Sequence, residues 1–388
     1  MIPETIELAN LFMGLSLAID LAEGRRLQHA HNVTYVACRL GEELGLPESA
    51  MNSLFFTGLL HGIATISDKN LCPVCAAIED FEEDGVAEAL HDTDQAIHLS
   101  QEYWDGRGPR GLTGKGIPLL SRILALSIGL EENNAATARR EYYLWQETAR
   151  DYLVKNQGIY YDPELVSVFL GILRDRRFSL NLSNPNSSEK LAPYRPKARI
   201  NGRGKTMTLL GKAFASVIDQ KSSYTANHSR DVAEVSKQLA AKLGLDARSQ
   251  MDLYLAGLLH DLGKIAISNE ILDKQGPLTD KEFAIVKNHP HYTAVILDRI
   301  PELKRLGEIA SLHHEKISGD GYYLGIAGQD IPFASRIIAV ADIYSALAVD
   351  RPYRRALDAR TIKEVMFGML KDNHLDGSVV EALFSTVG

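Results

Sequence analysis

The chain is short of cysteine, of tryptophan and of long apolar runs. Its 388 residues include three cysteines and two tryptophans. Cys38, Cys72 and Cys75 are too few and too unevenly spaced for a disulfide framework, so we expect a reducing, cytoplasmic compartment. The apolar stretch at residues 11–19 ends at Asp20, is too short to cross a bilayer, and follows an acidic start unlike a signal peptide. We therefore expect no membrane partner.

An excess of positive charge is also lacking. The chain has 42 Lys and Arg against 50 Asp and Glu, which gives a net charge of −8. Non-specific nucleic-acid binders are usually basic, so we expect no DNA partner. A small anionic ligand needs only a local positive pocket and stays compatible with this balance. An apolar content of 45% is enough for sizeable cores, and the length predicts two domains.

The two halves of the chain repeat each other. An offset of 199 residues aligns the first pairs without a gap, and offsets of 213 and 214 align the later ones. The pairs include Asp20 with Asp219, His29 with His228, His61 with His260, Glu102 with Glu315, and Asp162 with Asp376. This is the pattern of a tandem duplication. We expect domains at residues 1–178 and 206–388, joined by a linker at 179–205 that is rich in Asn, Ser, Pro and Lys.

Apolar spacing predicts helices in both halves. Val232, Val235, Leu239 and Leu243 fit one face of a helix that begins near His228. The apolar run at residues 337–341 has the length of a buried strand, but it continues into a longer segment that fits a buried helix better. Alternating strand patterns are scarce, so we expect an all-α fold made of two tandem helical bundles.

Residues with metal-ligand chemistry are concentrated in the C-terminal half. A lone buried histidine is more often a core residue than a ligand, so the case depends on the set as a whole. Histidine and carboxylate together suit iron, manganese or zinc-like cations. Adjacent residues on a helix point about 100° apart, so His260 and Asp261 serve two metals if the carboxylate bridges. The set comprises His228, His260, Asp261, His289, His313, His314 and Asp342.

The residues from about Thr206 to the C-terminus resemble the HD-GYP family of bacterial HD phosphohydrolases. The matching strings are Tyr224 to Ser229, His260 to Lys264, His289-Pro290, His313-His314-Glu315, Gly319 to Tyr322, and Asp342 with Arg351 to Arg354. The resemblance implies an HD-type helical bundle that hydrolyses a cyclic dinucleotide with two or three metals. It places His228, His260, Asp261 and Asp342 at one metal, and His289, His313 and His314 at the other, with Asp261 as the bridge.

Two departures from the family pattern bear on this expectation. Members with a third metal carry glutamate where this chain has Tyr224, so we expect two divalent metals, iron or manganese. The family's Gly-Tyr-Pro is Gly321-Tyr322-Tyr323 here, which alters the loop without removing a ligand. His291 lies off the matching position and is not expected to be a ligand.

The resemblance also implies a mechanism. A bridging hydroxide would attack the phosphodiester and open the ring to the linear 5′-phosphodinucleotide. Asp261 and Lys264 would be catalytic, with Lys264 neutralising charge on the phosphoryl oxygens. Lys264, Tyr322, Arg351 and Arg354 would bind substrate, although the two arginines taken alone fit a solvated turn.

The N-terminal half has lost the ligands. Gly62 stands for Asp261, Ser100-Gln101 for His313-His314, and Ile128 for Asp342, while His29 and His61 remain, with His91 or His98 in reach. A regulatory or dimerising domain is the first interpretation, and a packing relic is the second. A single Cys72-to-Cys75 CxxC has no second pair, so we expect no metal site there.

Three functions remain open at this stage. The first is a phosphodiesterase that acts on cyclic di-GMP, on 3′,3′-cyclic GMP-AMP, or on both. The second is another HD-type nucleotide phosphohydrolase. The third is a non-catalytic signalling scaffold that binds the dinucleotide or a cyclase. A homodimer, or a cyclase or other signalling protein, is the expected protein partner.

Overall fold

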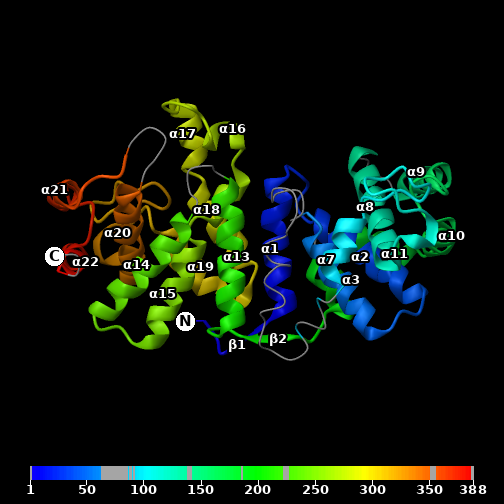
Figure 1. Ribbon diagram of the computed structural model, residues 1–388, viewed down its shortest axis with the longest axis horizontal. Coiled ribbons are helices and arrows are strands. Elements are labelled where there is room, and N and C mark those ends of the chain that lie inside the picture. Colours follow the sequence, from blue (N-terminus) through cyan, green and yellow to red (C-terminus); the bar gives the residue numbers. More distant parts are fainter. Residues whose placement is uncertain are drawn as a thin grey trace. The chain divides into compact units, whose positions relative to one another are not determined.

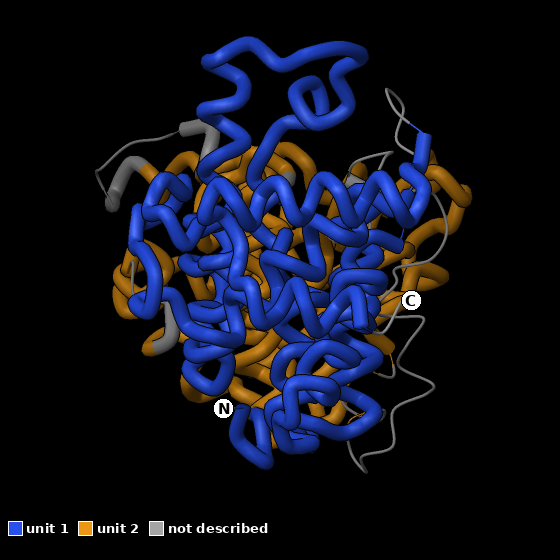
Figure 2. Tube along the Cα trace, turned by 90° about the vertical axis from the view of Figure 1, so that its left-hand side faces the viewer, with its two compact units in different colours: residues 1–6, 200–388 blue, residues 7–199 orange. Residues whose placement is uncertain are grey.

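The computed structural model is built from helices, as the sequence predicts (Figure 1). It describes residues 2–62, 86, 90, 92–137, 142–184, 187–221, 227–349 and 355–385. These residues form two compact units, one of residues 7–199 and one of residues 1–6 with 200–388 (Figure 2). The expectation of an all-α fold is confirmed. Within the described part of the chain, no helix has the length and apolarity needed to cross a membrane.

The described strands are two short segments that pair with each other. β1 (Thr5–Glu7) and β2 (Arg199–Asn201) form a two-stranded sheet. The amide of Gly202 donates to the carbonyl of Glu4 at 2.9 Å, and the amide of Leu8 donates to that of Ala198 at 3.0 Å. The chain passes between its two units at this sheet.

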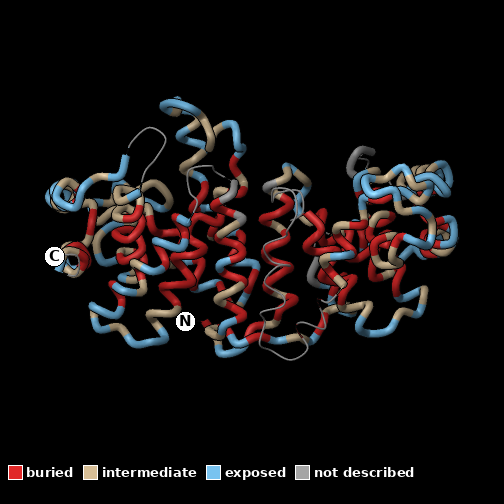
Figure 3. Tube along the Cα trace, viewed as in Figure 1, coloured by how far each residue is buried: buried red, intermediate tan, exposed pale blue. Residues whose placement is uncertain are grey.

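In the unit of residues 7–199, α2 packs on α3 and on α8 around the apolar core (Figure 3). Its helices are α1 (Leu8–Ala22), α2 (His29–Glu43), α3 (Glu48–Leu60), α7 (Thr93–Leu99), α8 (Leu119–Thr137), α9 (Tyr142–Asn156), α10 (Pro163–Ile172), α11 (Arg176–Ser183) and α12 (Ser187–Leu191), with 3₁₀ turns η2 (Gly114–Gly116) and η3 (Ala192–Tyr194).

In the second unit, α14 packs on α15 and α20, and α18 packs on α19 and η4. Its helices are α13 (Lys205–Lys221), α14 (His228–Lys242), α15 (Ala247–Leu259), α16 (Asn269–Leu272), α17 (Asp280–Val286), α18 (His289–Asp298), α19 (Lys304–Ser311), α20 (Phe333–Ala348), α21 (Ala359–Lys371) and α22 (Gly377–Phe384). The 3₁₀ turns are η4 (Leu262–Ala266), η5 (Pro301–Leu303) and η6 (Gly328–Asp330). The helix expected near His228 and the buried helix expected at residues 337–341 are both present as α14 and α20.

In the segment expected to be a linker, residues 179–205, the described residues include regular secondary structure. The segment holds the end of α11, all of α12 and η3, and β2, and its residues up to 199 belong to the N-terminal unit. Leu182 and Leu191 are buried there. Two apolar anchors therefore hold a segment whose other side chains are mostly polar.

Equivalent positions of the two units share local interactions. Gln28 and Asn227 are non-glycine residues with positive φ, 75° and 78°, and each immediately precedes its helix, α2 or α14. Arg122 pairs with Asp162, as Arg336 does with Asp376. These pairings follow the offsets of the sequence repeat and support a duplicated frame.

Candidate metal centre

Six of the predicted ligands of the C-terminal unit lie at or next to helix ends, and Asp342 lies within a helix. His228 opens α14, His289 opens α18, and His260 directly follows α15. His313 and His314 follow α19, Asp261 precedes η4, and Asp342 lies in α20. Six of the seven side chains are buried, and His314 is half-buried. The structure brings all seven residues together.

Asp261 lies in the middle of this cluster. Its Oδ2 is 3.3 Å from His260 Nε2 and 3.9 Å from His228 Nε2. Its Oδ1 is 3.3 Å from His289 Nε2 and 3.9 Å from His313 Nε2. Each carboxylate oxygen therefore faces a different pair of histidines, which is the arrangement a bridging ligand needs.

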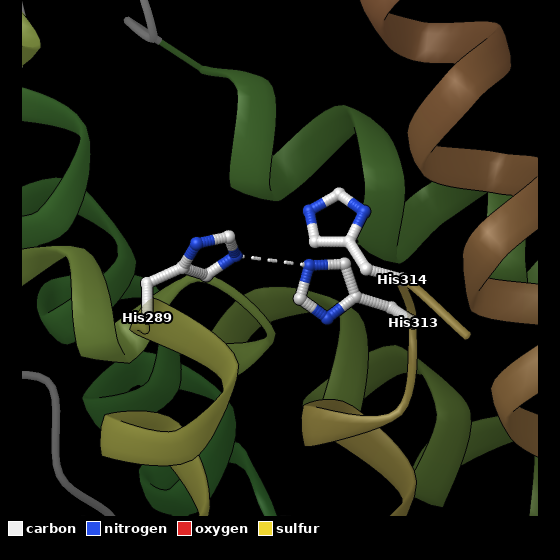
Figure 4. Close-up of side chains that lie close together, drawn as sticks. All are labelled: His289, His313 and His314. Carbon is white, nitrogen blue, oxygen red and sulfur yellow. Dashed lines mark hydrogen bonds between the residues drawn. The ribbon is translucent and has the colours of Figure 1, made fainter. Parts of the chain in front are cut away.

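The remaining ligands complete the two sides. Asp342 Oδ1 is 3.1 Å from His228 Nε2 and 3.9 Å from His260 Nε2. On the other side, Nε2 of His289 and Nε2 of His313 are 3.3 Å apart, and the rings of His313 and His314 are 4.0 Å apart (Figure 4). Ligand atoms converge in three groups that could each hold a cation: His289, His313 and His314; His228, His260 and Asp261; and His260, His313 and Asp342.

Backbone carbonyls orient three of the histidines. Nδ1 of His260 donates to the carbonyl three residues earlier, that of Gly257, at 2.7 Å. In the same way, Nδ1 of His289 donates to the carbonyl of Val286 at the end of α17 at 2.8 Å, and Nδ1 of His313 donates to that of Ala310 in α19 at 2.7 Å. A carbonyl can only accept, so Nδ1 carries a proton in each ring, and Nε2 is the nitrogen that points into the cluster and can bind a cation when it is unprotonated. This is how metal-binding histidines are usually fixed.

Two buried atoms in the cluster have no hydrogen-bond partner among the described residues. They are Nε2 of His260 and Oδ1 of Asp261. Buried polar atoms normally find a partner, because an unpaired one costs about 1–3 kcal/mol. Both atoms belong to predicted ligands and point into the cluster, so cations fit the site.

The electrostatics of the cluster favour bound cations. Burial would raise the pKa of Asp261, but His260 and Lys264 hold it well below its usual range. Burial would lower the pKa of His260, but Asp261 and Asp342 raise it to about 9. Asp261 and Asp342, which favour the protonated form of His260, are also the carboxylates that would bind a cation. Metal binding therefore competes with protonation of His260.

Lys264 and Tyr322, predicted to bind substrate, lie beside the cluster. Lys264 Nζ is 2.5 Å from Asp261 Oδ2. The Tyr322 ring lies 4.5 Å from the ring of His314. Lys287, which follows α17, was not anticipated from the sequence, and its Nζ lies 5.5 Å from the centre of the Tyr322 ring.

Thr293 was also not anticipated. Its hydroxyl donates to the carbonyl of His260 at 3.0 Å and accepts from the amide of Gly263 at 2.9 Å. A Cβ at Gly263 would lie 1.9 Å from the carbonyl oxygen of His289. Gly263 therefore permits the close approach of α18. Thr293, which lies in α18, holds this contact through its hydrogen bonds to Gly263 and His260.

The Gly321-Tyr322-Tyr323 loop is held by a buried carboxylate. Oε1 of Glu315 accepts from the amide of Leu324 at 2.5 Å and from that of Gly325 at 3.3 Å. A Cβ at Gly321 would lie 2.7 Å from the Cα of Glu315. The missing proline therefore does not leave this loop unsupported.

Several residues named from the sequence lie outside the described part of the chain. They include the predicted substrate contacts Arg351 and Arg354, which therefore stay predictions. The others are Tyr224, His91, Cys72 and Cys75.

The equivalent place in the N-terminal unit holds an arginine. Nη1 of Arg25 donates to Nε2 of His29 at 2.6 Å and to Nε2 of His61 at 3.1 Å. Nδ1 of His61 donates to the carbonyl of Gly58 at 2.7 Å, the same three-residue pattern as at His260. His98 lies near Asp94 instead. The offset of 199 places Arg25 opposite Tyr224, which is the sequence signal that could have revealed it.

Comparison with known proteins identifies a family and several relatives of similar sequence. The family model described as HD domain matches residues 82–165 and 212–379. The 3′3′-cGAMP-specific phosphodiesterases 3 and 1 of Vibrio cholerae are 29% and 25% identical, over 91% and 97% of this chain and 89% and 91% of their own. A cyclic di-GMP phosphodiesterase of Pseudomonas aeruginosa is 38% identical over 45% of this chain and 43% of its own.

The fold is shared as well. The crystal structure of the cyclic GMP-AMP specific phosphodiesterase V-cGAP3 of V. cholerae matches 99% of this chain and 98% of its own, with a TM-score of 0.70 and 26% identity. The resemblance to HD-type cyclic-dinucleotide phosphodiesterases is thereby confirmed, and the chain belongs to the HD domain family.

Proposed function

We propose that the chain is a metal-dependent phosphodiesterase that opens a 3′,3′-cyclic dinucleotide to the linear 5′-phosphodinucleotide. The observation that carries the proposal is Asp261, whose two carboxylate oxygens face two different pairs of histidines. A complete ligand set argues against a non-catalytic scaffold. The curated relatives of similar sequence act on cyclic dinucleotides, which argues against a different nucleotide substrate.

The described residues divide between two cations. His228, His260 and Asp342 would hold one, and His289, His313 and His314 the other, with Asp261 between them. Imidazole and carboxylate ligands suit iron and manganese, which we propose as the metals. When bound, such a pair of cations lowers the pKa of water and polarises a phosphodiester for in-line displacement.

The chain's own residues would supply orientation and charge. Lys264 Nζ, which is already paired with Asp261, would turn toward a phosphoryl oxygen as negative charge builds there. Tyr322 presents a ring beside His314 on which a base or ribose could rest. Arg351 and Arg354 are proposed to bind the second phosphate or a base edge.

Of the two substrates, 3′,3′-cyclic GMP-AMP is favoured. The two relatives that match nearly the whole chain are both named as specific for cGAMP. The Pseudomonas cyclic di-GMP enzyme matches less than half of this chain. Cyclic di-GMP remains the second candidate.

The test is turnover by purified, metal-loaded protein. The chain would be purified anaerobically, its iron and manganese quantified, and cyclic GMP-AMP, cyclic di-GMP and a linear dinucleotide supplied separately. We expect the linear product, with faster turnover of cyclic GMP-AMP. Failure of every cyclic substrate with metals loaded would overturn the proposal.

We propose different roles for the two halves of the chain. Catalysis is proposed for residues 206–388, and a regulatory or dimerising role for residues 1–178. A homodimer, a cyclase partner and a cytoplasmic location stay predictions.

A further inference from the structure

The N-terminal unit has a cavity where the C-terminal unit has its metal cluster. The cavity has a volume of about 330 Å³ and is lined by His61, Ser100, Gln101 and Ile128, among others. The sequence offsets place these four opposite His260, His313, His314 and Asp342. The cavity is therefore the counterpart of the metal centre. Its size lies at the lower end of small-ligand pockets.

Arg25 takes the place of a cation in this cavity. Its Nη1 is within hydrogen-bond distance of the Nε2 atoms of both His29 and His61, which are 3.2 Å from each other, and its Nε is 2.9 Å from Glu23 Oε2. Burial lowers the pKa of His29 to about 3 and that of His61 to about 4, so both rings are neutral acceptors. Arginine stays protonated in proteins. The guanidinium of Arg25, which is always charged, thus lies where the C-terminal unit would hold an exchangeable metal cation.

Within the part of the chain that the structure describes, Nη2 of Arg25 makes no hydrogen bond. Nη2 is 3.9 Å from Glu132 Oε1, which is beyond hydrogen-bond distance. The Glu132 side chain is 57% exposed. The cavity therefore presents an arginine donor next to a carboxylate acceptor.

Aromatic side chains build the rest of the wall. Tyr103 and Tyr160 meet edge to face at 4.7 Å and are 39% and 41% exposed. Behind them the hydroxyls of Tyr152 and Tyr161 are 2.6 Å apart, and a Cβ at Gly129 would lie 1.8 Å from the Tyr161 hydroxyl. None of these tyrosines has a tyrosine at its offset position in the C-terminal half. A relic under packing constraints alone would be expected to fill with apolar side chains.

These groups fit the edge of one base. Guanine presents the acceptor O6 beside the donors N1–H and N2–H₂. Arginine is a frequent partner of guanine O6, and a carboxylate accepts from adjacent N–H groups. Exposed aromatic rings supply a stacking surface for a base. Adenine offers a single amino donor and no O6, and so matches the pair less well.

We infer that this cavity binds the guanine base of a nucleotide without any metal. The inference does not depend on the activity of the C-terminal centre. Guanine could come from a free mononucleotide or from a cyclic dinucleotide, so both sources enter the test.

Tryptophan fluorescence can test this site separately. The two tryptophans of the chain, Trp104 and Trp145, both lie in the N-terminal unit. Trp104 adjoins Tyr103, and its amide donates to the carbonyl of Tyr160 at 3.3 Å. The full-length protein in chelator would be titrated with 5′-GMP, 5′-AMP and cyclic di-GMP. We expect a saturable signal with GMP and at least about tenfold weaker binding of AMP.

Variants at exposed positions keep the test independent of folding. Glu132→Gln should weaken GMP binding by about tenfold or more and leave AMP binding nearly unchanged. Tyr160→Ala should weaken both. Glu147→Gln, an exposed change on α9 outside the cavity lining, is the matched control.

The outcomes are distinct. Tighter binding of cyclic di-GMP than of GMP would identify the second messenger as the source of the base, and the reverse would identify the mononucleotide. The inference is overturned if neither guanine ligand changes the fluorescence, if AMP binds as well as GMP, or if Glu132→Gln binds GMP like the wild type.

Discussion

The two units place a pair of histidines at equivalent sequence positions, but the groups that face these histidines carry opposite charges. In the C-terminal unit, His228 and His260 face the carboxylates of Asp261 and Asp342. In the N-terminal unit, His29 and His61 face a guanidinium. The helix starts and the arginine–aspartate pairs are kept in both. The two units therefore share these local interactions and differ in the charge that faces the paired histidines.

The largest expected effect comes from removing the central carboxylate. Asp261→Ala should lower turnover of the cyclic dinucleotide by at least about 10³-fold, because the proposed bridge and the partner of Lys264 are both lost. Metal content should fall with activity. Kinetics and metal analysis on one preparation check this, with Asp280→Ala, an exposed change at the start of α17 in the same unit, as the control. Full turnover by Asp261→Ala would contradict the proposed centre.

The reverse substitution should fail to rebuild a centre in the N-terminal unit. A Cβ at Gly62 would lie 2.5 Å from Ile19 Cγ2 and 2.7 Å from Glu23 Oε2, and Arg25 already fills the space. We expect Gly62→Asp with Ile128→Asp to bind no extra metal. The unit should lose about 3 kcal/mol of stability, measured by denaturant unfolding. If the double variant binds an added equivalent of metal tightly, the prediction is wrong, and restoring two carboxylates is enough to build a metal site in the N-terminal unit.

A smaller effect is expected from the residue that positions His260. Thr293→Val keeps the shape of the side chain but removes the hydroxyl that joins the carbonyl of His260 to the amide of Gly263. We expect metal affinity or turnover to fall by about 10- to 100-fold. Thr293→Ser restores the hydroxyl and should recover most of the loss. If both variants behave alike, the hydrogen bonds of Thr293 are not what matters.

The smallest effect concerns acid stability of the N-terminal unit. Burial lowers the pKa of His61 from its ordinary value of 6.5 to about 4 in the folded protein. The unfolded chain therefore binds more protons between these values, and stability falls as pH drops through this window. His61→Gln, whose amide oxygen can still accept from Arg25, should reduce the loss between about pH 7 and about pH 5 by about 1–2 kcal/mol.

Denaturant unfolding followed by tryptophan fluorescence measures this difference, since both tryptophans lie in this unit. The carboxyl of Asp20, whose pKa burial raises to about 8, titrates in the opposite sense but is common to both proteins. An identical pH dependence for the two proteins would mean that His61 is not the titrating group.

Much of the fold could be predicted because the relevant signals are local. The spacing of Val232 and Leu239 and the run at residues 337–341 each belong to one helix, and α14 and α20 are where they were expected. The burial of Leu182 and Leu191 could not be read from the polar composition of residues 179–205, because burial depends on the packed fold.

Much of the site could be anticipated, but its supports could not. The seven predicted ligands carry recognisable motifs, and the structure brings these residues together. Thr293 carries no motif, since its role depends on α18 reaching a turn about 30 residues earlier in the chain. Arg25 and His61 are 36 residues apart, and their contact depends on how α1 and α3 pack. Such relations are properties of the packed fold.

The carboxyl ends of helices have a further consequence. α15, α17 and α19 each end just before a cluster histidine, His260, His289 or His313, and that histidine's Nδ1 donates to a carbonyl of the last turn. Helix dipoles place partial negative charge at such ends. The backbone itself therefore attracts cations, before any ligand side chain is counted. In the N-terminal unit α3 likewise ends just before His61, and the positive charge of Arg25 lies beside that helix end. We therefore expect an arginine four residues before the first histidine to indicate, from sequence alone, a unit of this fold in which a guanidinium takes the place proposed for a metal.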